Sequence, residues 1–389
     1  MKNYKWILFL PLTLVLLLVL SGSCFAEGSG ISDPLAGIAD DQKYNRAIHI
    51  MAMLLLGFGF LMVFVRKYGR SALTATFLLV SIALPMYMWL KSINIFGETV
   101  GDIDRLIYAE FGAASLLITA GAVLGRLKMP QYILLGALFI PVYMFNEWIV
   151  LENGLNLIPK GGVADTGGSI VIHAFGALFG LGVAVTMTTK KEMGKPIEAD
   201  ETSDRYSMLG SMVLWIFWPS FCAALVPMEA MPHTVVNVIL ALCGSTLVTY
   251  VASVGLRGKI SLADIANAAL AGGVAIGATC DHATYSSAIL IGALAGGIST
   301  FGFAIIQAKQ QKLMKLIDTC GVSNLHGLPG LMGGLAALPI VKGLNIGYQL
   351  SGIGITIVVA VVGGLIVGKI LPVLGRKTEA YEDAEEFME

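Results

Sequence analysis

Long apolar runs separated by short polar segments dominate the chain. A membrane-spanning helix needs about 20 mainly apolar residues to cross a hydrocarbon core about 30 Å thick. Such helices are apolar on almost every face, so helical periodicity is uninformative here. The pattern predicts an all-α, polytopic membrane protein. Eleven segments qualify as transmembrane helices: 46–65, 71–92, 104–125, 131–151, 166–188, 207–227, 233–255, 262–280, 285–306, 321–341 and 347–370.

A separate segment precedes these spans. Two lysines begin it, an apolar run covers residues 6–20, and the small-residue sequence Ser-Cys-Phe-Ala ends it. This order is typical of a secretory signal peptide. A retained first helix is the alternative, whereas a lipoprotein site at Cys24 fits poorly because Ser21 stands where leucine is usual. We predict a signal peptide over residues 1–26, cleaved after Ala26, and hence a bacterial cell envelope.

Composition narrows the classes of function. The chain is 56% hydrophobic and 13% charged, with a net charge of −1, and it has no broad basic surface for nucleic acid. No two of the five cysteines stand in CxxC spacing, so we expect neither a disulfide framework nor a metal cluster, and no cofactor. The four cysteines after Cys24 are interpreted as small buried apolar residues.

Lys and Arg predict the orientation, because they accumulate on the cytoplasmic side of a membrane. With the mature N-terminus outside, the inner segments carry sixteen of them and the outer segments six. We therefore predict a multi-pass protein of the bacterial inner membrane, with a periplasmic N-terminus and a cytoplasmic C-terminus. The hydrophilic inner loop 189–206 separates two halves of a channel domain, 27–188 and 207–371. The acidic tail 372–389 has little to bury and is expected to be mobile.

A short motif occurs once in each half. Asp165-Thr-Gly-Gly-Ser-Ile-Val-Ile-His173 matches Asp318-Thr-Cys-Gly-Val-Ser-Asn-Leu-His326 in spacing, with four identical residues. The copies lie on the fifth and tenth predicted spans. An offset of five helices reverses the direction of the chain, so the halves are predicted to be inverted repeats. Each Asp can cap backbone N–H groups at a helix start, and a direct functional role for the pair stays equally open.

The motif also predicts where the two histidines lie. Eight residues of helix cover about 12 Å, which is most of the distance from the membrane surface to its middle. His173 descends from the outer face and His326 rises from the inner face, so the imidazoles are expected to converge near mid-membrane. Ionisable side chains at this depth are costly and usually face a cavity or the bundle interior. We interpret the pair as a functional site.

Several stretches resemble the ammonium transporter and Rhesus (Rh) glycoprotein family, and specifically its Rh branch. They occur in the family's order from the third span to the tenth. They are AGAVLGR at 120–126, FNE at 145–147, DTGGSIVIHAFGALFGL at 165–181, LWIFWPSF at 214–221, NAALAGGVAIG at 267–277 and DTCGVSNLHGLPGLMGG at 318–334.

The resemblance implies a homotrimer in which each subunit encloses its own narrow pore within an eleven-helix bundle. It implies a channel for ammonia, taken from ammonium, and not an enzyme. Family residues of the pore match the twin histidines His173 and His326, the stacked gate rings Phe111 and Phe221, and the helix-start acids Asp165 and Asp318.

One departure from the ammonium-transporter branch concerns the outer entrance. That branch typically reads FNAGS after its second gate, where the serine helps a cation site, whereas this chain reads Phe221-Cys-Ala-Ala-Leu225. The absence of these polar residues at the entrance implies weaker cation capture and net passage of neutral gas. Glu110 and Glu147 are interpreted as bonding neighbouring helix ends, or alternatively as guiding a proton or ammonium. His49, His233 and His282 lie near outer span boundaries and are interpreted as interfacial.

Three other functions remain to be weighed against an ammonia channel. A carbon dioxide pore stays open because both gases are small and neutral, and so does an electrogenic ammonium carrier. A sensor is less favoured because no output domain is recognised after Leu371. An enzyme would need a convergent nucleophile or metal set, and two histidines fall short of one.

Overall fold

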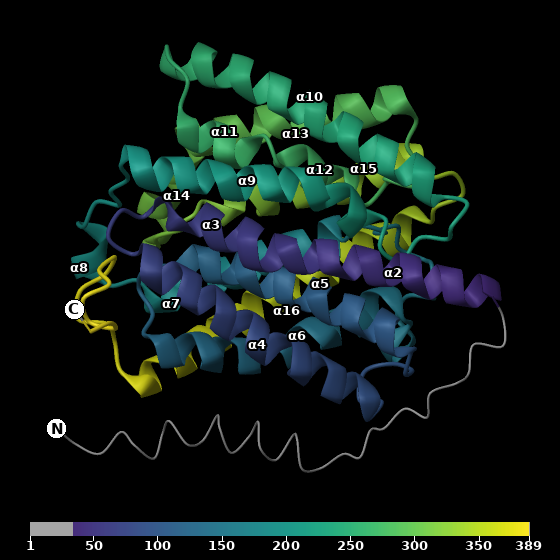
Figure 1. Ribbon diagram of the computed structural model, residues 1–389, viewed down its shortest axis with the longest axis horizontal. Coiled ribbons are helices and arrows are strands. Elements are labelled where there is room, and N and C mark those ends of the chain that lie inside the picture. The colour runs from purple at the N-terminus through teal and green to yellow at the C-terminus, as the bar shows by residue number, and fades with distance from the viewer. Residues whose placement is uncertain (1–33, 389) are drawn as a thin grey trace.

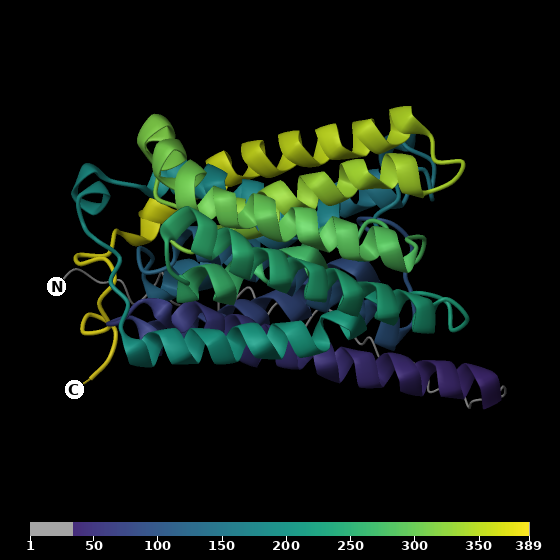
Figure 2. The same ribbon diagram turned by 90° about the horizontal axis from the view of Figure 1, so that it is seen from above.

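The computed structural model describes residues 34–388, so the predicted signal peptide lies outside the described residues. Within that range the chain is a strand-free bundle whose long helices run along one common direction (Figures 1 and 2). Eight helical segments are long and apolar enough to cross a membrane: Ala36–Phe64, Gly69–Ser92, Asp102–Val123, Met129–Leu151, Ser169–Met187, Met231–Arg257, Tyr285–Met314 and Ile346–Leu374. The all-α class and the membrane-spanning helices are thereby confirmed.

The other three predicted spans also coincide with helices, but these do not reach the same length and apolarity. They are α9 (Glu201–Cys222), the broken pair α11 (Leu262–Ala268) and α12 (Ala271–Ile276), and η6 (Ser323–Gly327) followed by α15 (Leu328–Ile340). Figure 1 shows α9 and the α11–α12 pair running alongside the longer helices. The count of eleven spans stays a prediction.

Several spans consist of consecutive helical pieces. These are α2 (Pro34–Ala52) with η1 (Met53–Phe58), α3 (Gly59–Leu61) and η2 (Met62–Phe64); η4 (Ser169–Ala174) with α7 (Phe175–Met187); α13 (Tyr285–Phe301) with η5 (Gly302–Ile306) and α14 (Gln307–Met314); and α16 (Ile346–Ile370) with η7 (Leu371–Leu374). The remaining elements are α4 (Gly69–Ser92), α5 (Asp102–Val123), α6 (Met129–Leu151), η3 (Gly154–Asn156), α8 (Lys190–Met193) and α10 (Met231–Arg257).

Small residues let the helices approach closely. A Cβ atom at Gly292 of α13 would lie 1.9 Å from the carbonyl oxygen of Ala241 on α10, and one at Gly364 of α16 would lie 2.2 Å from that of Phe179 on α7. In lipid the hydrophobic effect does not drive helices together, so close van der Waals contacts of this kind stabilise the bundle instead. Large apolar side chains point outward instead, as Leu247 does with 67% of its surface exposed. The outer surface suits a hydrocarbon environment.

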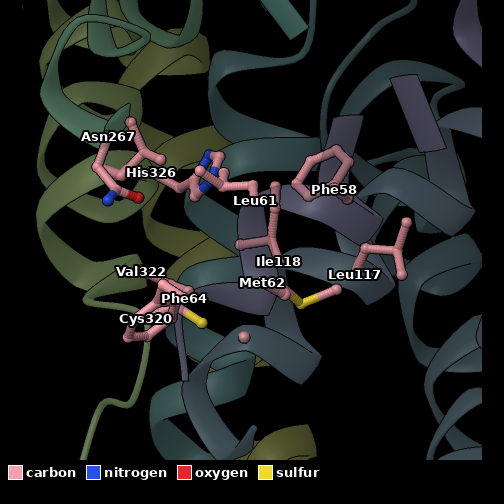
Figure 3. A pocket seen from close by; sticks show the side chains of 12 residues that line it. Phe58, Leu61, Met62, Phe64, Leu117, Ile118, Asn267, Cys320, Val322 and His326 are labelled. Carbon is pink, nitrogen blue, oxygen red and sulfur yellow. The ribbon is translucent and has the colours of Figure 1, made fainter. Parts of the chain in front are cut away.

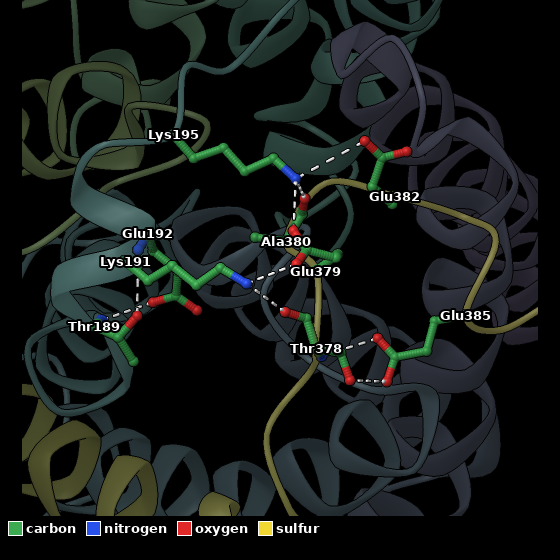
Figure 4. A network of polar contacts seen from close by, with 9 residues as sticks. All are labelled: Thr189, Lys191, Glu192, Lys195, Thr378, Glu379, Ala380, Glu382 and Glu385. Atoms are coloured by element: carbon green, nitrogen blue, oxygen red, sulfur yellow. Dashed lines mark hydrogen bonds and ion pairs between the residues drawn. The ribbon is translucent and has the colours of Figure 1, made fainter.

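The acidic tail is docked against the bundle, so the expectation of a mobile tail was wrong. Glu379 pairs with Lys191 at 2.6 Å (Figure 4), and Asp383 pairs with Arg70 at 3.4 Å. The backbone N–H of Tyr381 donates to the carbonyl of Gly125 at 2.9 Å, and the Tyr381 side chain is buried. The tail has few apolar residues of its own. The buried Tyr381 ring and the ion pairs with basic residues of neighbouring loops stabilise its docked position.

Candidate functional site

Each copy of the repeated motif begins a helix with a buried carboxylate. Asp165 accepts hydrogen bonds from the backbone N–H groups of residues 170 and 171, and Asp318 accepts them from residues 322 and 323; each of these N–H groups has a carboxylate oxygen at 2.9 Å. This is the capping geometry that the sequence predicted, because the first N–H groups of a helix have no partner within it. Both caps hold a π-helical turn, η4 or η6, that carries a histidine.

The two histidines lie together in the interior. The Nδ1 atoms of His173 and His326 are 3.2 Å apart, the ring planes differ by 11°, and both side chains are buried. One Nδ1–H must donate to the other Nδ1. In a neutral pair the donor ring therefore has an unprotonated Nε2, and the acceptor ring has an Nε2–H. The predicted approach of the two imidazoles is thus observed, and the pair offers one acceptor and one donor at its far ends.

Aromatic rings enclose His173 on its outer side. The rings of Phe111 and Phe221 have centroids 4.8 Å apart, and the Phe221 ring lies 6.0 Å from that of His173. The indole of Trp218 stacks on His173 at 5.5 Å with an interplanar angle of 22°. Within the described residues, the Nε1–H of Trp218 and the Nε2 of His173 are both buried without a hydrogen-bond partner. The indole donor and the His173 Nε2, which donates or accepts according to the tautomer, are therefore both left free around the same imidazole.

A large cavity borders Phe111 at the end of the bundle that is predicted to face outward, and it is called the outer cavity below. Its volume is about 840 Å³, and Phe111, Tyr143, Glu147, Asp165 and His282 are among the residues lining it. The lining carries carboxylate, hydroxyl and imidazole groups, so water and hydrated ions can enter. The Phe111 ring lines this polar space and packs against the Phe221 ring, which lies next to His173.

A much smaller cavity touches the other histidine (Figure 3). Its volume is about 20 Å³, and apart from His326, Asn267 and Cys320 its lining consists of hydrocarbon, aromatic or thioether side chains and one glycine. A volume of about 10–15 Å³ on this scale holds one water molecule. The space therefore fits roughly one molecule of the size of water or ammonia.

A third cavity continues beyond the small one. Its volume is about 180 Å³, and it shares Phe64, Asn267 and Cys320 with its neighbour. Asp204 and Gln307 add polar groups to its lining. The three cavities and the ring cluster form a series from a polar outer space, past two imidazoles, through a narrow apolar gap, to a polar inner space.

In the part of the chain that the structure describes, Glu110 and Glu147 do not bond neighbouring helix ends, so that interpretation was wrong. Glu147 accepts hydrogen bonds from the hydroxyl groups of Tyr87 and Tyr143, the latter at 3.1 Å. Neither carboxylate oxygen of Glu110 has a hydrogen-bond partner among the described residues, although the side chain is fully buried. Glu147 lines the outer cavity, whereas Glu110 lines none of the three cavities.

The remaining histidines lie away from the pair. His49 is 2.9 Å from the hydroxyl of Ser220, His233 is 2.8 Å from the carbonyl of Ala283, and His282 is half exposed at the outer cavity. Among residues 34–388, no three His, Cys, Asp or Glu side chains are grouped to hold a metal ion.

Sequence reasoning missed several residues of the site. Trp218 stands three positions before Phe221 on α9, so both lie on one helix face, and that spacing could have identified it. Phe58, Leu61 and Phe64 line the small cavity at steps of three residues, but apolar residues recur at that spacing throughout this chain. No signal in the sequence distinguished them.

Comparisons with known proteins agree with one another. The chain matches the model of the Ammonium Transporter Family over residues 42–387. Ammonium transporter Rh type A of Bos taurus is 37% identical over 350 residues, which cover 86% of this chain and 79% of that protein. Ammonium transporter Rh type B of Oryctolagus cuniculus is 36% identical over 383 residues, covering 88% and 81%.

Solved structures give the same picture. Nitrosomonas europaea Rh50, of the Rhesus protein family of channels, superposes with a TM-score of 0.88 at 54% identity, covering 90% of this chain and 93% of that one. Saccharomyces cerevisiae Mep2 superposes with a TM-score of 0.72 at 18% identity, covering 90% and 93%, which shows a shared fold.

Proposed function

Because the chain belongs to the ammonium transporter family, and within it to the Rh branch, we propose that it is a membrane channel for ammonia whose pore passes His173 and His326. The observation that carries this proposal is the 3.2 Å contact between two buried imidazoles from the two repeats. It lies between a polar outer cavity and a polar inner cavity, as a conduction path requires.

The proposed topology has eleven spans in the bacterial inner membrane. Eight long apolar helices support it, and α9, the α11–α12 pair and η6–α15 supply the other three. The excess of Lys and Arg in the inner loops supports a periplasmic N-terminus, after a signal peptide over residues 1–26, and a cytoplasmic C-terminus. The halves 27–188 and 207–371 form one pore in each subunit of a homotrimer.

In this proposal ammonium arrives in the outer cavity and transfers a proton to the water that fills it, so that neutral ammonia passes the rings of Phe111 and Phe221. The small cavity below His326 has mostly apolar walls, and an ion there would lose its hydration without adequate compensation. Neutral ammonia can donate to one imidazole nitrogen and accept from another, so a neutral histidine pair replaces part of its hydration. Asp165 and Asp318 act as helix caps, with proton handling as a second role for them.

One feature favours ammonia over carbon dioxide. The Nε2 of His173 is buried without a partner among residues 34–388, and whichever tautomer is present, ammonia can either donate to it or accept from it. Carbon dioxide has no hydrogen to donate, so it cannot satisfy an unprotonated nitrogen. The pair therefore recognises a small neutral molecule that is both donor and acceptor.

The proposal is tested on proteoliposomes that contain the purified protein. Stopped-flow pH measurements are made with an ammonium gradient and then with a bicarbonate gradient, for the unmodified chain, His173→Ala, His326→Ala and the double variant. Residues of one site are not additive, so the double variant should conduct no less than the worse single variant. Current across a supported membrane separates neutral ammonia flux from electrogenic ammonium transport.

His282→Ala is the matched control, because it removes an imidazole that lines the outer cavity and does not contact the pair. It should keep most of the ammonia flux. Ammonia flux at the unmodified rate in all three pore variants, each shown to be folded and trimeric, would refute the proposed role of the histidines. A bicarbonate response larger than the ammonium response would replace ammonia with carbon dioxide as the substrate.

A further inference from the structure

The small cavity beside His326 meets the inner cavity of about 180 Å³ at a junction of three residues. Phe64, Asn267 and Cys320 line both spaces. A phenyl ring and a thiol offer little hydrogen bonding, since a thiol is only a weak donor and a weak acceptor. Asn267 is therefore the residue of this junction that carries a strong acceptor, its amide oxygen. The path proposed above assigns no role to it.

The amide of Asn267 has a fixed orientation. Its nitrogen donates a hydrogen bond to the carbonyl of Ala263, about one turn earlier on α11, at 2.9 Å. The amide oxygen therefore points away from that carbonyl. Figure 3 shows the Asn267 amide beside His326, with its oxygen turned toward the side chains that line the small cavity. The acceptor thus faces the space that ammonia would occupy.

The backbone next to Asn267 is held by a neighbouring helix. Asn267 lies in the last turn of α11, just before the break that separates α11 from α12. The hydroxyl of Ser245 on α10 donates to the carbonyl of Ala268 at 2.8 Å and accepts from the N–H of Gly272 at 3.0 Å. One hydroxyl therefore ties both sides of the break to α10. Such support keeps a binding group in place without the ligand.

Ammonia needs an acceptor at this point of the path. In the small cavity it lies next to His326, but most of the other walls are apolar. Further polar groups, including those of Asp204 and Gln307, begin only in the inner cavity. Because the small cavity holds about one molecule, ammonia in it is within reach of both the imidazole and the amide oxygen. It can donate to Asn267 while its bond to His326 breaks, so it is never without a partner, which would be costly.

We propose that Asn267 is an ammonia-binding residue, which passes ammonia from His326 to the inner cavity. Its amide oxygen accepts a hydrogen bond from ammonia, which stays neutral, and no proton is transferred. An ammonium ion is not held at this position, because one neutral oxygen replaces too little of its hydration beside apolar walls. The inference rests on the proposed function, since it adds a residue to the same path.

The test compares two variants that differ in a single hydrogen-bonding group. Asn267→Thr and Asn267→Val introduce side chains of nearly the same shape and the same β-branched stiffness. A threonine hydroxyl can donate to the Ala263 carbonyl and still accept from ammonia, whereas a valine side chain does neither. Stopped-flow pH measurements are made on proteoliposomes with an ammonium gradient. Ammonia flux should fall by about three- to tenfold in Asn267→Val, as expected for one lost hydrogen bond, and Asn267→Thr should keep most of it.

Asn45→Val is the matched control, because Asn45 makes the same kind of bond away from the path. Its amide nitrogen donates to the carbonyl of Asp41 on α2 at 2.9 Å, and it lines none of the three cavities. Its flux should equal that of the unmodified chain. Gel filtration checks that each variant is a folded trimer. If β-branched residues prevent folding at this position, Asn267→Ser and Asn267→Ala make the same comparison.

Two outcomes would overturn the inference and leave the proposed function intact. Equal flux in Asn267→Val and Asn267→Thr, whether reduced or unchanged, would mean that the acceptor is not used. A fall in Asn45→Val as large as that in Asn267→Val would mean that the loss does not depend on the path. If instead the unmodified chain conducts no ammonia, the proposed function fails, and this inference fails with it.

Discussion

The two Asp-to-His motifs have the same spacing and the same kind of cap, but they border cavities of very different size. Asp165 lines an outer cavity of about 840 Å³ with several polar groups. His326 lines a cavity of about 20 Å³ with mostly apolar walls. A repeat can therefore keep one scaffold, two capped helices that bring two histidines together, while the surrounding side chains make the cavities beside the two copies different.

This difference assigns separate tasks to two parts of the proposed pore. Hydrated ions can be collected where the space is wide and polar, because desolvation is not yet required. Selection against ions belongs to the small cavity beside His326, where about one small molecule fits and its hydration shell does not. The main asymmetry lies in the cavity linings, since each carboxylate accepts two backbone N–H groups, those of residues 170 and 171 for Asp165 and of residues 322 and 323 for Asp318.

The largest effects should come from removing the caps, which tests the part that the two copies share. Asp318→Ala leaves two buried backbone N–H groups without an acceptor, and each such group costs about 1–3 kcal/mol. We expect a loss of about 2–6 kcal/mol in the free energy of unfolding, measured by denaturant unfolding in mixed micelles. Asp165→Ala should lose a similar amount, because its carboxylate holds the same number of N–H groups.

Asp165→Asn and Asp318→Asn serve as matched controls, because an amide oxygen still accepts hydrogen bonds but carries no charge. They should retain more stability than the alanine variants. If they keep stability and lose ammonia flux, the charge has a role beyond capping. Equal stability of the alanine variants and the unmodified protein would contradict the capping role.

A smaller but more local effect is expected from filling each cavity in turn. Ile118→Phe adds bulk to a cavity with room for about one molecule, so we expect ammonia flux to fall by about tenfold or more, equivalent to about 1.4 kcal/mol in barrier. Leu344→Phe makes the matched change in the outer cavity, which has about 840 Å³ to accommodate it, and should change flux little.

Folding is checked by gel filtration for both variants, and Leu61→Phe tests the same small cavity from the first span. Equal flux in Ile118→Phe and Leu344→Phe would mean that the narrow cavity does not limit passage. The contrast between the outer cavity and the small cavity would then lose its functional meaning.

The sequence predicted what the repeat determines and missed what side-chain packing determines. The spacing from Asp to His, the inversion of the halves and helix rise were enough to predict that His173 and His326 meet. Trp218 and Phe58 were not found, because an aromatic residue in an apolar helix can face the pore, a neighbouring helix or lipid.

The expectation of a mobile tail was wrong for a related physical reason. Its own composition is acidic and suggests a solvated segment, but the basic residues that neutralise it lie on other loops, such as Lys191 and Lys195. Helix α9 shows the opposite case. It begins with charged residues, whose composition suggests a loop, and it is a long helix all the same. Local composition is a poor guide wherever a segment's partners come from elsewhere in the chain.

The smallest effect is expected at the tail, which occupies only the predicted cytoplasmic end and so adds to the asymmetry. The hydrogen bond from Lys191, together with its positive charge, lowers the pKa of Glu379 below its ordinary value. The ion pair therefore contributes above the ordinary pKa of a glutamate and is lost as the pH falls through the lowered value. Glu379→Gln removes it at every pH.

At neutral pH we expect the variant's tail to be cleaved faster by an added protease, by less than about fivefold, because exposed ion pairs are weak. The two proteins should become equal below the lowered pKa, and also in high salt, which screens exposed charges. Glu201→Gln, at the exposed Arg205 pair on α9, is the control and should leave tail cleavage unchanged. A difference between Glu379→Gln and the unmodified chain that persists in acid would mean that the side chain acts through packing, and the electrostatic account of docking would be wrong.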